Sequence, residues 1–267
     1  MELIILGTGN AQATACYNTC FALKQGDACF LVDAGGGNGI FTQLKKADIR
    51  LEQIHTVFLT HKHIDHLLGA LWLVRIVAQR MEKGAYHGTL TVYGNAEVMA
   101  LLLQLCEMLL QKKQTAHIGQ DILFITVGDG EEITALDCRV TFFDIGSAKA
   151  SQFGFSMLLP NGKKLTCCGD EPYNAGEETY VRNSAWLLHE AFCLFAEADR
   201  FHPYEKHHST VREACALAET MDVDNLILYH TEDSHLPDRQ TPYLAEGKRY
   251  YSGNLLIPDD LERYVLC

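Results

Sequence analysis

The sequence predicts a mixed fold of the α/β or α+β class. Short apolar runs rich in β-branched and aromatic residues recur along the chain, and turn signals bound them, as is typical of buried strands. Longer stretches repeat their apolar residues at the helical period. Strands and helices are followed by further strands and helices, an order that suits two facing sheets with helices outside.

The first half of the chain alternates between predicted strands and helices. Residues 21–23 and 29–32 flank Gln25-Gly26-Asp27, a turn signal, and therefore predict a hairpin. The helix expected at residues 97–112 is nearly saturated with Leu and Met, which indicates packing rather than a cofactor surface. The other strands are expected at residues 3–6, 54–60 and 89–93, and the other helices at residues 40–46 and 67–78.

The second half is richer in strands. Residues 122–127, 132–135 and 138–143 are predicted as strands of a second sheet. Residues 153–159 and 164–168 predict a hairpin around Pro160-Asn161-Gly162. A helix is expected to begin at Ser209 or Thr210, and the buried strand at residues 226–229 runs into His230.

Length and composition favour one large domain over residues 1–267, because 48% hydrophobic content supports a sizeable core and no linker interrupts it. The start of the chain lacks a basic flank and a long apolar region, so we expect no signal peptide, no membrane span and a cytoplasmic protein. The ten cysteines are scattered through predicted core elements, which favours reduced, buried thiols over disulfides.

The charge of the chain limits its partners. Its 22 basic and 34 acidic residues give a formal net charge of −12. Binding to a nucleic-acid backbone depends on basic side chains, so a broad nucleic-acid surface is not expected. A small phosphoester bound directly to a metal is still compatible with this charge.

The stretch from Thr60 to His66, Thr-His-Lys-His-Ile-Asp-His, gathers four potential metal ligands at a strand-to-helix turn. Residues at i and i+2 of an extended segment point the same way, so His61 and His63 can share one ion. Asp65 and His66, turned aside, can reach a second ion. The spacing therefore suggests two adjacent metals.

This motif resembles the signature of the metallo-β-lactamase fold, a superfamily of mostly hydrolytic dinuclear metal enzymes. The resemblance implies an αββα sandwich of two facing mixed sheets with helices outside. Asp170, in Cys168-Gly169-Asp170, matches the carboxylate that bridges both metals in that family, and His230 matches its last ligand, on the second ion. Asp33 could be a plain strand-end residue or, as in the family, a support for the histidine loop.

Two further motifs are similar to the H-E-A-T and H-S-T motifs of the ribonuclease Z branch. The first is His189-Glu190-Ala191, with Phe192 in place of the threonine, and the second begins at His208. The resemblance implies that His208 acts near the leaving group and that Glu190 orients it, which suits an imidazole tuned by a carboxylate. Asp65 is expected to take part in catalysis as well as metal binding. A purely structural alternative for the stretch around His208 is helix capping.

The chain departs from the family pattern at one ligand. The family supplies a further histidine to the first metal shortly before a Gly-Phe or Gly-Tyr pair, here Gly154-Phe155. The preceding segment contains no histidine, and Gly146 is the expected occupant of the position. The first ion would then keep His61, His63 and Asp170, and its site would be only partly occupied.

The leading hypothesis is therefore a metal-dependent phosphodiesterase similar to ribonuclease Z. Two divalent ions, zinc or alternatively manganese, would hold a bridging hydroxide as the nucleophile. The substrate would be a small phosphodiester or an RNA 3′ end, since the Gly/Pro/Lys-rich arm that grips tRNA in long-armed relatives is missing. The branch is commonly dimeric, so a homodimer is among the expectations. The alternatives are a degenerate member that binds a nucleotide or other anion with little turnover, and a hydrolase of a thioester or lactone.

Overall fold

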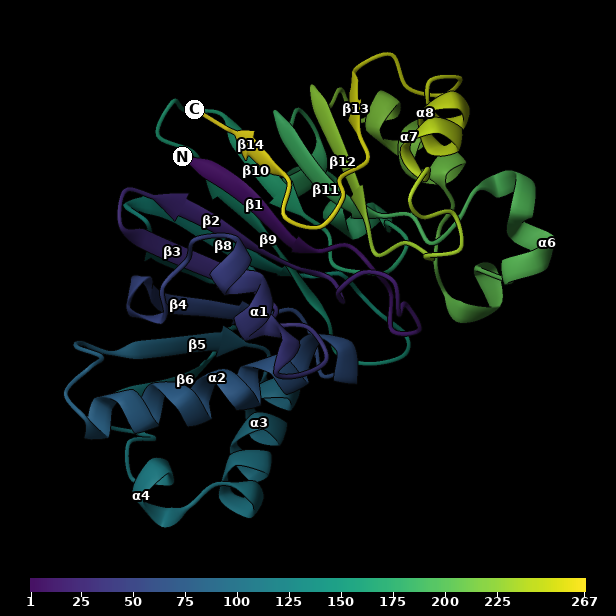
Figure 1. Cartoon of the computed structure of the whole chain (residues 1–267). Coiled ribbons are helices and arrows are strands. Elements are labelled where there is room, and N and C mark those ends of the chain that lie inside the picture. Colours follow the sequence, from purple (N-terminus) through teal and green to yellow (C-terminus); the bar gives the residue numbers. More distant parts are fainter.

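The computed structural model describes residues 1–267 and contains two seven-stranded mixed sheets that face each other (Figure 1). The first sheet has the order β14-β1-β2-β3-β4-β5-β6, with antiparallel pairing from β14 to β3 and parallel pairing from β3 to β6. Its strands are β1 (Glu2–Gly7), β2 (Cys20–Gln25), β3 (Ala28–Val32), β4 (Ile54–Leu59), β5 (Leu90–Gly94), β6 (Ile122–Thr126) and β14 (Arg263–Val265).

The second sheet has the order β13-β12-β11-β10-β9-β8-β7. Strands β10 to β13 are parallel, whereas β7 to β10 form an antiparallel meander. Its strands are β7 (Glu132–Ala135), β8 (Cys138–Asp144), β9 (Phe153–Leu158), β10 (Lys164–Cys167), β11 (Trp186–Glu190), β12 (Asn225–Tyr229) and β13 (Asn254–Leu256).

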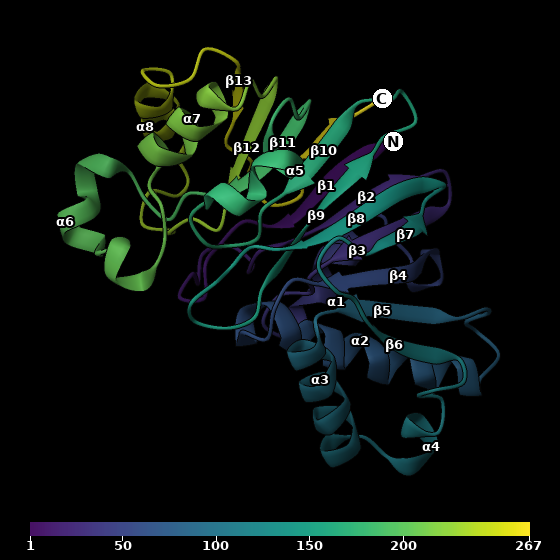
Figure 2. The same ribbon diagram turned by 180° about the vertical axis from the view of Figure 1, so that it is seen from behind.

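Helices cover the outer faces of both sheets (Figures 1 and 2). The helices on the first sheet are α1 (Gly39–Lys46), α2 (Ile64–Glu82), α3 (Ala96–Leu109) and α4 (Lys112–Thr115). Those that follow the second sheet's strands are α5 (Glu178–Val181), α6 (Ala198–Phe201), α7 (Val211–Thr220) and α8 (Gln240–Gly247). Short 3-10 turns are η1 (Leu51–Gln53), η2 (Ala175–Glu177), η3 (Phe195–Glu197) and η4 (Tyr204–Lys206). None of these helices is both long and apolar enough to span a membrane.

Central strands such as β1 are apolar on both sides because both faces of the sheet are covered there. In β1, Leu3 and Ile5 face the layer between the sheets, while Ile4 and Leu6 face the helices of the first half. Successive side chains of a strand point to opposite faces, so a strand buried on both faces is a continuous apolar run. The observed layers are those of the αββα sandwich that the resemblance implies.

Two predictions about elements need correction. The strand expected at residues 122–127 in a second sheet is β6, and it pairs in parallel with β5 at the edge of the first sheet. The chain returns to that sheet through α3 and α4, so β6 completes a crossover instead of starting the next layer. The helix expected at residues 97–112 ends at Leu109, because Leu110 is already extended with φ −95° and ψ 158°. All ten cysteines are free and eight of them are buried, whereas Cys16 is partly exposed and Cys267 is exposed.

Candidate metal centre

The predicted metal ligands all follow the carboxyl ends of strands. His61, His63, Asp65 and His66 follow β4, Asp170 follows β10, and His230 follows β12. Strands β3 and β4 are parallel, as are β10 to β12, so the loops after them meet at a common edge. The loop after β1 reaches the same edge.

Three of the predicted ligands surround one carboxylate oxygen of Asp170, and the other two adjoin these histidines. Oδ2 of Asp170 lies 3.6 Å from Nε2 of His61, 3.4 Å from Nε2 of His66 and 3.4 Å from Nε2 of His230. Nε2 of His66 is also 3.3 Å from Oδ2 of Asp65. Nε2 of His61 lies 2.8 Å from Nδ1 of His63. Of the six side chains, only that of His63 is not buried. Residues more than 100 positions apart in sequence thus form one cluster.

The second nitrogen of each central imidazole is held from outside the cluster. These contacts fix the ring orientation and leave Nε2 facing Asp170, an arrangement that is typical of metal-binding histidines. The partners of Nδ1 are Thr60 Oγ1 for His61 (2.9 Å), Asp33 Oδ2 for His66 (2.8 Å) and Thr19 Oγ1 for His230 (3.1 Å).

Asp33 occupies the supporting position that the family resemblance implies. Besides its contact with His66, it accepts hydrogen bonds from the backbone N–H and the hydroxyl of Thr60, both at 2.9 Å. Its φ of 55° lies in the left-handed region, and so does the φ of 57° at His230. Non-glycine residues rarely adopt this conformation, and such strain collects at functional sites. The surrounding hydrogen bonds therefore hold these two side chains in place against a backbone preference.

The electrostatics of the cluster suit cation binding. Burial lowers the pKa of His61 well below its usual value and lowers that of His230 to about 4, so both rings are neutral. Burial also acts to lower the pKa of His66, but the Asp65 and Asp33 carboxylates raise it well above the usual value. The neighbouring histidines overcome the effect of burial on Asp170, whose pKa is well below the usual range. The neutral rings of His61 and His230 and the ionised carboxylate of Asp170 are in the forms that divalent metals require of their ligands.

The donor set fits divalent metal ions. Nε2 of His66 is buried and has no hydrogen-bond partner, so it has an unused lone pair or N–H directed into the cluster. The donor atoms of Asp65, His66 and His230 lie within 4.8 Å of one another, as do those of His61, His66 and Asp170. Mixed imidazole and carboxylate donors in a buried cluster are typical of zinc and related metals.

The segment that lacks the family's histidine contributes a glutamine instead. Nε2 of Gln152 donates a hydrogen bond to Oδ1 of Asp170, and the Gln152 side chain is buried. Gly146, the occupant expected from the sequence, lies beside Asn174, and its N–H bonds to Asp144 at 2.8 Å. The contact of Gln152 with Asp170 was not predicted. Glutamine is not a usual zinc ligand, and its spacing from Gly154-Phe155 did not indicate a role at the metal centre.

His208 and Glu190 lie beside the cluster, as the two shorter motifs predict. Nδ1 of His208 is 3.6 Å from Oε2 of Glu190, and its ring centroid is 5.3 Å from that of His230. Burial lowers the pKa of His208, but the Glu190 carboxylate more than compensates, and the net shift is upward. Capping of α7 falls to Thr210, whose N–H and hydroxyl both bond to Glu213. The capping alternative thus applies to Thr210 and leaves His208 available.

Phe192, which replaces the threonine of the family motif, packs directly on His208. The two rings are stacked, with centroids 5.0 Å apart and planes at 7°. The ammonium of Lys206 also lies over the Phe192 ring, 4.7 Å from its centroid. The replacement of threonine by Phe192 was visible in the sequence, but its stacking on His208 could not be predicted from it.

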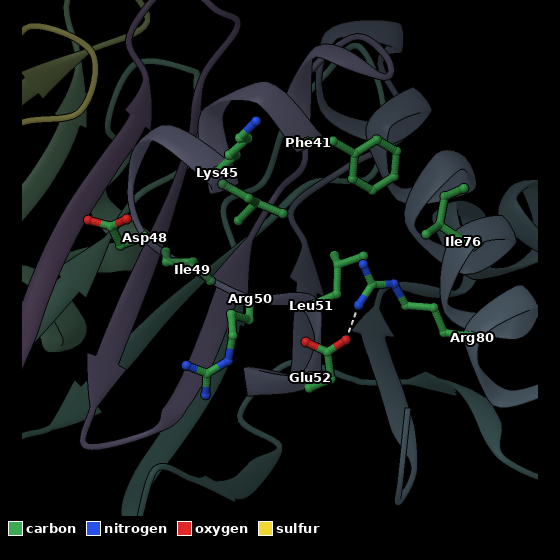
Figure 3. A pocket seen from close by; sticks show the side chains of 10 residues that line it. Phe41, Lys45, Asp48, Ile49, Arg50, Leu51, Glu52, Ile76 and Arg80 are labelled. Atoms are coloured by element: carbon green, nitrogen blue, oxygen red, sulfur yellow. Dashed lines mark hydrogen bonds and ion pairs between the residues drawn. The ribbon is translucent and has the colours of Figure 1, made fainter. Parts of the chain in front are cut away.

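The largest of the described cavities lies elsewhere. It has a volume of about 750 Å³ between α1 and α2, and none of the residues that line it is a predicted ligand. Figure 3 shows its apolar wall, with Phe41, Leu51 and Ile76, and the ion pair of Arg80 with Glu52 at its rim. The cavity therefore supplies no group to the metal centre.

Comparisons with known proteins agree with the fold and the motifs. A ribonuclease Z of Picosynechococcus sp. is 25% identical, with the match covering 98% of this chain and 95% of that protein. One of Listeria monocytogenes serotype 4b (strain CLIP80459) is also 25% identical and covers 97% of both chains. The resemblance to the ribonuclease Z branch is therefore confirmed.

Solved structures confirm the fold. The metallo-β-lactamase fold protein YhfI from Bacillus subtilis superimposes with a TM-score of 0.79 at 19% identity, covering 98% of each chain. The short form of human tRNase Z gives a TM-score of 0.76 at 20% identity and covers both chains completely. At the level of sequence families, the model described as "Anti-Pycsar protein Apyc1" matches residues 1–252, nearly the whole chain. On this match, the chain belongs to the Anti-Pycsar protein Apyc1 family.

Proposed function

We propose that this protein is a metal-dependent phosphodiesterase. The observation that carries the proposal is the convergence of three imidazole Nε2 atoms on Oδ2 of Asp170, with the His208–Glu190 pair beside them. Relatives of the full chain are named ribonuclease Z, and a structural neighbour with a TM-score of 0.76 at 15% identity is described as a diphosphatase of the PhnP family. Both names denote hydrolysis at phosphorus.

The ligand residues divide between two ions. His61, His63 and Asp170 would hold the first, and Asp65, His66 and His230, with Asp170, the second. Zinc suits these donors best, with manganese as the alternative, and the first site would be less fully occupied because it lacks the family's further histidine. When bound, such ions supply Lewis acidity and an activated water to hydrolysis at phosphorus. Asp33, Thr60 and Thr19 keep the rings in the required orientation.

His208 is placed to act as general acid. Its Nδ1 faces Glu190, which leaves Nε2 for the oxygen of the leaving group. Glu190 is itself fixed, because its carboxylate accepts a hydrogen bond from the backbone N–H of Ser209. The upward shift of the His208 pKa favours the protonated ring, which is the form that can supply a proton to an alkoxide leaving group.

A small phosphodiester is the substrate class that the chain favours. A net charge of −12 gives a polynucleotide little electrostatic attraction, whereas a single phosphodiester group can bind at the metal centre. The names of the relatives make an RNA 3′ end the alternative. Incubation with precursor tRNA and with a 3′,5′-cyclic nucleotide separates the two, because trimming of the RNA would contradict the small substrate.

The proposal is tested by metal content and turnover together. Protein purified without chelator should contain about one to two zinc or manganese ions per chain. His63→Ala should lose metal from the first site together with hydrolysis of bis-p-nitrophenyl phosphate. His208→Ala should keep its metal but hydrolyse a cyclic nucleotide, with its alkoxide leaving group, about 10²- to 10⁴-fold more slowly. The exposed His87 provides the control, since His87→Ala should leave both properties unchanged.

Absence of bound metal, or metal-loaded protein without phosphodiesterase activity, would overturn the proposal. Equal losses for His208→Ala with p-nitrophenolate and alkoxide leaving groups would contradict the general-acid role. We further propose a homodimer, in line with the branch that the chain resembles. Light scattering on the eluting protein decides this point, since the mass of one chain is 29.8 kDa.

A further inference from the structure

The position of His208 depends on contacts beyond its pairing with Glu190. Nδ1 of His208 and Oε2 of Glu190 lie 3.6 Å apart, which is longer than a hydrogen bond, and neither buried atom has another hydrogen-bond partner. A movement of about 0.5 Å at the imidazole ring therefore decides whether this bond closes. The segment that carries His208 has to be held in place by other residues.

His208 follows directly after the 3-10 turn η4, and the backbone at this junction is strained. His207 has a φ of 54°, in the left-handed region that non-glycine residues rarely adopt. The backbone N–H of His208 donates back to the carbonyl of Pro203 at 2.9 Å. The carbonyl of Lys206, at the end of the turn, accepts its hydrogen bond from a different part of the chain, namely from Lys149. The turn is thus closed from outside.

Lys149 belongs to the loop between β8 and β9, in which the family's further histidine is missing. Besides its bond to the Lys206 carbonyl, its ammonium lies 3.9 Å from Oε1 of Glu171, the residue after Asp170. The same Glu171 oxygen accepts a hydrogen bond from the Ser147 hydroxyl at 2.8 Å, and this hydroxyl accepts one from the N–H of Lys149 at 3.2 Å. Among the hydrogen bonds and ion pairs of the structure, Lys149 makes the only link between this loop and η4.

The charge of Lys149 by itself does not help the general acid. Burial and the Lys149 ammonium both act to lower the pKa of His208, and the Glu190 carboxylate more than compensates for them. A nearby cation opposes protonation of an imidazole, so the benefit of this lysine is geometric. An ammonium is favourable at the carboxyl end of a helical turn, where the carbonyls lack partners within the turn.

We propose that Lys149 is a positioning residue for the general acid. By joining the loop after β8 to the Lys206 carbonyl, it fixes η4 and with it the distance between His208 and Glu190. Lys149 acts through His208 and makes no contact with the leaving group. The inference rests on the proposed phosphodiesterase function, and it gives the loop that lacks the histidine ligand a role in proton transfer.

The change Lys149→Met removes the ammonium and keeps the aliphatic stem. It should slow hydrolysis of a 3′,5′-cyclic nucleotide about 10- to 100-fold, because the acid is misplaced. Hydrolysis of bis-p-nitrophenyl phosphate should fall by less than about threefold, since its leaving group needs no proton. Lys149→Arg should recover most of the rate with the cyclic nucleotide. The exposed Lys83 provides the matched control, because Lys83→Met should change neither rate.

A double-mutant cycle identifies the route by which Lys149 acts. In the His208→Ala background, adding Lys149→Met should slow the cyclic nucleotide by less than about twofold more, because the acid that Lys149 positions is gone. A full further loss in that background would overturn the proposal, since Lys149 would then act on the substrate directly. Equal losses of Lys149→Met with both substrates would also overturn it, because they would indicate a general disturbance of the site.

Hydrogen exchange tests the positioning without turnover. Loss of the Lys149 contact should speed exchange of the His208 backbone N–H about tenfold in the metal-loaded protein, whereas Lys83→Met should leave it unchanged. An unchanged exchange rate in Lys149→Met would overturn the proposal even in a protein that hydrolyses phosphodiesters. Faster exchange in Lys149→Met, together with no hydrolysis by the unchanged protein, would support the contact and count against the phosphodiesterase function alone.

Discussion

At the scale of single residues, the metal centre combines ligands whose residue type is restricted by metal chemistry with supporting residues whose type is not. Three histidines and an aspartate within Thr60 to His66 indicate metal binding from spacing alone. Thr19 and Thr60, which hold two of the rings, could not be predicted, because a threonine beside an apolar strand usually has no such role. Their function depends on tertiary contacts between positions that the sequence does not relate.

Gln152 illustrates the same limit and leads to a prediction. Its amide holds Oδ1 of Asp170, the carboxylate on which the other ligands converge. Gln152→Ala should therefore weaken zinc binding by about 10- to 100-fold, as removal of residues that support metal ligands typically does. The measurement is a zinc titration of chelator-stripped protein. Gln104→Ala, at an exposed position of α3, is the matched control.

An unchanged zinc affinity in Gln152→Ala would show that Asp170 is held well enough by its histidine neighbours. Loss of folding would be recognised by comparing the unfolding midpoints of the two variants without metal.

At the scale of elements, periodicity located most strands and helices but not their partners. The hairpin of β2 and β3 and the strand β4 lie where the apolar runs and turn residues predict them. The prediction that placed β6 in the second sheet was wrong. Its parallel pairing with β5 is formed through a crossover connection, which leaves no local signal in the sequence. The strands β13 and β14 have only three residues each, which is too short for a recognisable hydrophobic pattern in the sequence.

The turn between β10 and α5 contains a pH-sensitive contribution to stability. Glu177, at the end of η2, is buried, and burial raises the pKa of its carboxyl to about 7 although the N–H of Asn174 acts to lower it. Between the unfolded value of 4.5 and about 7, the unfolded chain releases this proton while the folded chain keeps it. This carboxyl therefore destabilises the fold increasingly as pH rises through that window.

Glu177→Gln should remove the effect, because an amide keeps the acceptor for Asn174 and cannot ionise. The variant should be more stable than the parent at pH 8 by up to about 3 kcal/mol, and the difference should shrink towards pH 5. Urea unfolding of both proteins across this range measures the difference. A difference that stays constant, or that grows towards low pH, would contradict the proposed titration.

At the scale of the whole molecule, the metal centre depends on two sheets being held face to face. The ligands of the first half follow β4, whereas Asp170 and His230 follow strands of the second sheet. The order of strands and helices suited two facing sheets, but pattern alone supported only an α/β or α+β fold, and the αββα sandwich followed from the family resemblance. Seven of the 22 buried residues in the layer between the sheets are aromatic.

Phe155 is the central residue of this layer. It comes from β9 of the second sheet, is fully buried, and its ring lies 5.7 Å from that of Phe30 and 5.8 Å from that of Phe58, both edge to face. Phe30 and Phe58 belong to the first sheet, so the contacts cross the interface between the layers. A ring removed here leaves a cavity that neither sheet can close without moving the other.

Phe155→Ala should therefore lower the free energy of unfolding by about 3–5 kcal/mol. The matched control is Leu158→Ala on the same strand, where the side chain is 42% exposed and a loss below about 1 kcal/mol is expected. Urea unfolding of metal-free protein measures both values without the contribution of bound ions. Similar losses in the two variants would mean that the sheets are not joined through this residue. A large loss confined to Phe155→Ala would show that the layer between the sheets limits the stability of the scaffold on which the metal ligands of both halves are placed.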